Sequence, residues 1–96
     1  MATEYELLRA ERERTLVDFL TAELAIGPTF VTMAWHARDD RNTSHFEQAK
    51  ANAVSCVETV NRFFGDLIDL EARKKIEVEL LELEQLIASL PEEAAQ

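Results

Sequence analysis

The dipeptide Gly27-Pro28 lies in the middle of the longest stretch of this chain that has helical periodicity. When each residue is advanced by about 100°, apolar residues on both sides of the dipeptide fall in one sector about 100° wide. Two separate helices would have no reason to share a phase. Pro28 lies opposite this sector, on the expected solvent side of the helix, where a proline bends a helix around its apolar side. The pattern predicts one long helix kinked at Gly27-Pro28, with a true break at Pro28 as the alternative. The sector comprises Tyr5, Leu8, Leu16, Phe19, Ile26, Phe30, Met33, Ala34 and Ala37.

Residues that end helices are scarce in the rest of the chain. The 96 residues include two glycines and two prolines, and Ala, Leu, Glu and Arg, which favour helices, are frequent. Capping residues mark helix starts at Thr3, Ser44 and Asp69. We therefore predict an all-α fold: an antiparallel up-down bundle of three helices, or of four if the first helix breaks. The bundle forms a single domain over 1–96, with helices at about 3–38, 44–64 and 69–90 and a tail at 91–96.

The second and third predicted helices each have one apolar face. The second presents Phe46, Ala49, Ala53, Cys56, Val57, Val60 and Phe64. The third repeats apolar residues at alternating spacings of four and three, as in a coiled coil. These are Ile76, Leu80, Leu83, Ile87 and Leu90.

The predicted helices differ in length, and this difference indicates a dimer. At 1.5 Å per residue, the first helix extends about 54 Å and the others about 32 Å. The far half of the first helix would then expose a large apolar stripe, which is unusual for a monomer. We expect a second copy of the chain to cover it through two-fold symmetry. If the helix breaks, residues 3–26 can instead complete a monomeric bundle. The candidate interface is Tyr5, Leu8, Leu16 and Phe19.

Two charged residues, Arg12 and Glu23, lie within the apolar sector. A charge on such a face must be paired, hydrogen-bonded or at an edge. Within one helix the two side chains are too far apart to meet, but in an antiparallel dimer Arg12 of one chain can meet Glu23 of the other. Such a pair would fix register more than it would add stability. Two alternatives remain open: exposure at the rim, or a pocket in which Glu23 is a buried carboxylate with a ligand-binding or catalytic role.

A polar cluster near the first turn was tested as a metal site. His36 and Asp40 are spaced i, i+4, and His45 follows the turn. Histidine and carboxylate are ligands that zinc and iron accept, but an ordinary helix-end contact between His36 and Asp40 is the preferred interpretation. The sequence contains no Glu-x-x-His, no Gly-x-Ser-x-Gly and no glycine-rich phosphate loop. We predict no metal, no cofactor and no catalytic residue.

Charge and composition narrow the classes of partner and compartment. The formal net charge is −9, which argues against a nucleic-acid partner and against an anionic membrane surface. The single cysteine, Cys56, excludes an intramolecular disulfide. We find no signal-peptide pattern and no apolar run near the roughly 20 residues that span a bilayer. We expect a soluble cytoplasmic protein without a membrane partner.

The segment from Arg38-Asp39 to His45 resembles the arginine, polar residue and histidine spacing of helical nucleases of the HEPN type. The match covers eight residues. The resemblance implies cleavage of RNA at a dimer interface by Arg38 and His45.

We therefore consider three functions from different classes. The leading hypothesis is a small protein-interaction or scaffold module that acts as a homodimer, binds protein and is not an enzyme. The second is a small-ligand or catalytic bundle centred on Glu23, with His36 and His45 nearby. The third is a HEPN-like ribonuclease. The first follows from the overlong amphipathic helix and from the absence of recognisable catalytic motifs.

Overall fold

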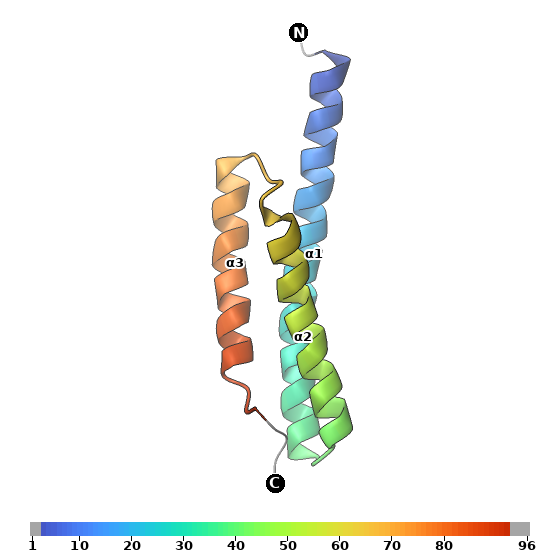
Figure 1. Cartoon of the computed structure of the whole chain (residues 1–96), viewed down its shortest axis with the longest axis vertical. Coiled ribbons are helices and arrows are strands. Elements are labelled where there is room, and N and C mark those ends of the chain that lie inside the picture. The colour runs from blue at the N-terminus through green and yellow to red at the C-terminus, as the bar shows by residue number, and fades with distance from the viewer. Residues whose placement is uncertain (1–2, 93–96) are drawn as a thin grey trace.

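The computed structural model describes residues 3–92, which form three α-helices (Figure 1). They are α1 (Glu4–Asp39), α2 (Thr43–Phe64) and α3 (Leu70–Ala88). The all-α class is confirmed, and each helix ends within one or two residues of its expected bounds. Of the predicted tail 91–96, residues 93–96 lie outside the described part of the chain.

The first helix is continuous. α1 runs through Gly27-Pro28 from Glu4 to Asp39, so the four-helix alternative with a break at Pro28 is wrong. Proline has no N–H to donate to the preceding turn. One turn later, the hydroxyl of Thr32 donates a hydrogen bond to the Pro28 carbonyl at 3.2 Å. The expected bend at Pro28 stays a prediction.

Short polar side chains begin the helices. The Thr3 hydroxyl accepts from the Glu6 amide at 3.1 Å, and the Asp69 carboxylate accepts from the Ala72 amide at 2.9 Å. These bonds satisfy amides that have no partner inside a helix. The start of α2 differs from the prediction. Its cap is Asn42, whose side-chain oxygen accepts from the His45 amide at 3.1 Å.

The turn between α1 and α2 contains the one strained residue found in the described backbone. The amide of Asn42 donates to the Ala37 carbonyl and that of Arg41 to the Arg38 carbonyl, which is the Schellman pattern of a helix end. Arg41 occupies the position where glycine is usual and has a φ of 58°. A left-handed backbone costs a residue with a Cβ about 1–2 kcal/mol.

Replacing Arg41 with glycine is therefore expected to stabilise the fold by about 1 kcal/mol, since glycine adopts a positive φ without a steric penalty. Urea unfolding followed by circular dichroism measures the difference. Arg41→Ala, which removes the same side chain but keeps the Cβ, is the control and should not stabilise the protein. Equal effects from both variants would show that the side chain and not the backbone sets the cost.

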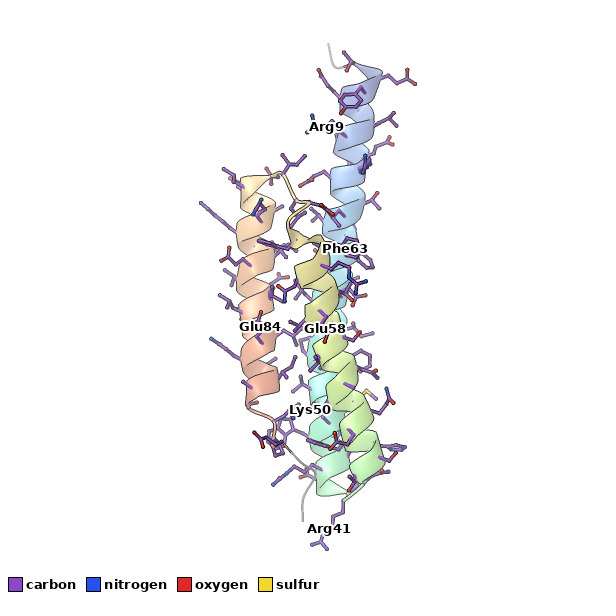
Figure 2. The ribbon with its side chains drawn as sticks, viewed as in Figure 1. Arg9, Arg41, Lys50, Glu58, Phe63 and Glu84 are labelled. Atoms are coloured by element: carbon purple, nitrogen blue, oxygen red, sulfur yellow. The ribbon has the colours of Figure 1, made fainter. Side chains whose placement is uncertain are left out.

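α1 and α2 form an antiparallel hairpin, and α3 returns parallel to α1 (Figure 1). Contacts at both ends hold α3 in place. At its start, the Glu13 carboxylate of α1 accepts from the amides of Ile68 and Asp69, at 3.0 and 3.1 Å. Beyond its end, the Lys50 ammonium of α2 donates to the Pro91 carbonyl at 3.2 Å (Figure 2). An anion therefore lies at the positive end of α3 and a cation near its negative end, as the helix dipole favours.

The core lies along the line where the three helices meet. The predicted seam of α3 is confirmed: Ile76, Leu80, Leu83 and Leu90 are buried, and Ile87 is half-buried. On α1 the buried residues Leu20, Leu24, Gly27, Val31 and Ala34 repeat at the same spacing of four and three. Leu83 lies directly against Gly27. The α2 residues of the core are Phe46, Ala49, Ala53, Cys56 and Val60.

The apolar sector of α1 is not the face that packs in the core. Of the apolar sector, only Ala34 and Ala37 are buried. The expected phase was fixed partly by Tyr5 and Leu8, which do not belong to the core. The centre of the true core face is displaced by roughly 70–90° around the helix, and Ala34 and Ala37 lie where the two faces overlap. The remaining members are half-buried or exposed: Leu16 and Phe30 are half-buried, and Tyr5, Leu8, Phe19, Ile26 and Met33 are exposed.

The expected solvent position of Pro28 is also wrong. Pro28 is half-buried and lies in the groove between α1 and α3, beside Leu83 and Leu86. The dipeptide therefore faces α3. Because glycine has no side chain, Leu83 of α3 can approach the backbone of α1 closely at this point.

Candidate functional site

The most prominent surface feature is the part of α1 that extends beyond the other helices. Figure 1 shows the blue N-terminal end of α1 standing clear of α2 and α3. This follows from helix length, because α1 has 36 residues, α2 has 22 and α3 has 19. The described chain is 63 Å long and only 18 by 16 Å across. We call residues 4–12 the overhang.

A hollow of about 960 Å³ lies where the overhang meets the end of α2. One wall is α1, and the other is the end of α2 with the following loop. Figure 2 shows Arg9 on the overhang and Phe63 at the end of α2. The apolar lining of the hollow includes Tyr5, Leu8, Leu16, Phe19, Phe63 and Ile68. Sequence reasoning missed Phe63 and Ile68. The signal for Ile68 is an isoleucine within a polar connection, whereas nothing distinguished Phe63 from Phe64.

The apolar sector continues from the hollow along α1 on the side of α2. The Phe19 ring packs edge to face on Phe63 with centroids 5.9 Å apart. One turn further, Glu23 contacts Cys56 of α2. Farther along, Ile26 and Met33 are 46% and 50% exposed. We call this surface the lateral stripe: Tyr5, Leu8, Arg12, Leu16, Phe19, Glu23, Ile26, Phe30 and Met33.

The candidate interface residues all lie on this stripe. Tyr5, Leu8 and Phe19 are 68%, 53% and 42% exposed, and Leu16 is half-buried. All four line the hollow, so the structure brings them to one surface. This arrangement leaves apolar area in water that a partner could remove.

Glu23 and Arg12 are not buried, contrary to one of the expectations for this pair. Glu23 is half-buried and Arg12 is exposed, and Arg12 lines the hollow. The Glu23 carboxylate lies beside the Cys56 thiol of α2. Burial of the thiol, then side-chain hydrogen bonding with Glu23, then the nearby charge of Glu23 together raise the pKa of Cys56 to about 11.

Cys56 is therefore expected to resist thiol reagents in the folded protein. With a pKa about two units above that of a free thiol, the thiolate fraction at pH 8 falls about 100-fold. Ellman's reagent should react much more slowly with folded protein than with urea-unfolded protein, and Glu23→Gln should speed the folded reaction. The unfolded chain loses the thiol proton at lower pH, so stability should fall as the pH rises from 9.0 toward about 11. Equal reaction rates of Cys56 with Ellman's reagent in folded and unfolded protein would contradict the raised pKa of its thiol.

The polar cluster lies at the other end of the bundle, around the turn between α1 and α2. His36 and Asp40 are exposed. The Arg38 guanidinium lies 5.7 Å from the Trp35 ring centre, and the His45 ring contacts the Asn42 amide at 3.0 Å. Within residues 3–92, no group of three His, Cys, Asp or Glu side chains is arranged to hold a metal ion.

One helix, α1, is long and apolar enough to cross a bilayer by length and composition alone. This helix contradicts the expectation that no apolar run comes near the roughly 20 residues that span a bilayer. Core helices of soluble proteins and signal sequences satisfy the same criterion, and six α1 residues are buried in the bundle.

Comparison with known proteins adds no assignment: no family model, curated protein sequence or solved structure matches this chain.

Proposed function

We propose that this protein is a small helical protein-interaction module that acts as a homodimer. The observation that supports the proposal is the exposed apolar surface of α1. Phe19, Ile26 and Met33 of this helix are 42%, 46% and 50% exposed, and the overhang adds Tyr5 and Leu8 to the same surface. Burying apolar area against a partner is favourable by about 25 cal/mol per Å².

The other two functions considered from the sequence receive less support. A ligand site centred on Glu23 needs a cavity at that side chain, but Glu23 lines neither of the two hollows found among the described residues. RNA cleavage by Arg38 and His45 needs a basic surface for phosphates, and the chain carries a net charge of −9.

Light scattering coupled to size exclusion tests the proposal. At micromolar concentration we expect a mass twice the chain mass of 10.9 kDa. Leu8→Glu should convert the dimer to a monomer, because it places a charge on the apolar surface that the partner covers. A monomeric wild-type protein would exclude the homodimer.

Leu7→Glu is the matched control. Leu7 and Leu8 are adjacent on one helix and 56% and 53% exposed, but only Leu8 lines the hollow. The Leu7 variant should remain dimeric.

Because α1 also has the length of a membrane span, both variants and the wild type should be mixed with lipid vesicles. Binding of a monomer to vesicles would assign the stripe to a lipid surface and contradict the proposal.

A further inference from the structure

We propose that two copies of this chain pair their α1 helices antiparallel about a two-fold axis between Val17 and Asp18, so that Arg12 of each copy binds Glu23 of the other. This inference rests on the proposed function and specifies its interface. The partner is a second copy of the chain, seated on the lateral stripe. Each copy supplies one arginine and one carboxylate, so that neither ion pair is complete without the other chain.

Charge complementarity selects this arrangement. Arg12 and Glu23 are the charged members of the lateral stripe and have opposite sign. In a parallel pair of α1 helices, Arg12 would lie opposite Arg12 of the other copy and Glu23 opposite Glu23, and these like charges would repel. In an antiparallel pair, both are neutralised at once when the axis lies midway between positions 12 and 23, which is between residues 17 and 18.

The same axis matches apolar residues. It places Leu16 opposite Phe19 of the other copy, and Tyr5 opposite Phe30. The overhang of one copy then lies over the half-buried part of the stripe in the other copy, alongside α2. The open side of each three-helix bundle is thereby covered by a fourth helix. The hollow between Leu8 and Phe63 lies on this path, so the second copy fills it.

The structure holds Glu23 ready for a second partner. Glu23 is half-buried beside the Cys56 thiol, and an ionised carboxylate has about four acceptor positions, more than one thiol can occupy. An arginine can therefore approach the free acceptors with two parallel N–H groups. Arg12 is exposed on the overhang, so its side chain can reach a neighbouring molecule.

Cysteine crosslinking tests the register. In a Cys56→Ala background, a chain carrying both Arg12→Cys and Glu23→Cys should form a covalent dimer under mild oxidation or with a short bis-maleimide. Chains carrying either change alone should not crosslink. In the antiparallel register, each position lies 11 residues from its own copy, about 16 Å along the axis. Self-crosslinking of the single variants would indicate a parallel pair and overturn the inference.

Charge exchange is an independent test. Arg12→Glu and Glu23→Arg should each weaken dimerisation about tenfold or more, and the double exchange should restore an affinity close to that of the wild type. If the wild type is dimeric but the 12–23 crosslink and the rescue both fail, this register is wrong and the proposed function stands. If the wild type is monomeric, the register and the proposed homodimer are both wrong. Circular dichroism of each variant checks that it is folded.

Discussion

Replacing Leu83 with alanine is expected to lower the free energy of unfolding by about 2 to 5 kcal/mol. Leu83 is 1% exposed and lies in the core between α1 and α3. Its side chain reaches the backbone of α1 at Gly27, and truncation leaves a cavity that the rigid helix backbone cannot fill. Urea unfolding at one fixed protein concentration measures the loss, since dimerisation makes stability depend on concentration.

The same variant is expected to reverse the effect of Gly27→Ala. In the wild type, a Cβ at position 27 would lie 2.5 and 2.9 Å from the two terminal carbons of Leu83. Overpacking of about 1–3 kcal/mol then exceeds the gain of about 1 kcal/mol that alanine brings to a helix. With alanine at position 83 the clash is removed, so Gly27→Ala should stabilise the protein. Destabilisation in both backgrounds would show that Gly27 is required for another reason.

Gly65→Ala is the control for this cycle. Gly65 has a φ of −64°, and a Cβ there would meet no atom within 4 Å. Alanine should therefore stabilise the protein slightly, by about 0.4–1 kcal/mol, through the unfolded chain. It should do so equally with leucine or alanine at position 83.

Replacing Phe46 with alanine is expected to cost about 3–5 kcal/mol. Phe46 is fully buried and is the largest of the fully buried side chains. It lies in the first turn of α2, next to the turn from α1. The Lys50 ammonium lies 6.0 Å from its ring centre and also donates to the Pro91 carbonyl. Loss of the ring therefore affects the packing of all three helices at this end of the bundle.

This loss approaches the total stability of 5–15 kcal/mol that is usual for a domain, so Phe46→Ala alone could leave no folded protein to measure. Phe46→Leu keeps most of the volume and should cost less than about 1.5 kcal/mol. Leu70→Ala, at a residue that is 70% exposed, should change stability by less than about 0.5 kcal/mol. A loss at Phe46 no larger than at Leu70 would contradict the assigned core.

Local patterns predicted the helices well and the packing of α1 poorly. Caps at Thr3 and Asp69 act over three residues, and α3 has a single apolar seam, so both were visible in the sequence. α1 instead has two adjacent apolar faces. Periodicity cannot show which one meets α2 and α3, because that choice depends on residues far away in the chain. The role of Gly27 depends on Leu83 in the same way.

The candidate site was partly predictable for a similar reason. The overhang follows from the relative lengths of the helices, and its exposed residues Tyr5 and Leu8 were expected. The second wall of the hollow was not expected, because the position of Ile68 depends on how the α2–α3 loop folds back toward α1. That path is set by the hydrogen bonds from its backbone to Glu13, which no local sequence pattern reveals.

The elongated shape of the molecule affects how its mass must be measured. A particle 63 Å long and 18 by 16 Å across experiences more friction in solution than a sphere of the same volume. It therefore elutes early from a gel-filtration column, and calibration with spherical standards overestimates its mass. A single chain would imitate a larger assembly by retention time, whereas scattered intensity and sedimentation equilibrium depend on mass itself.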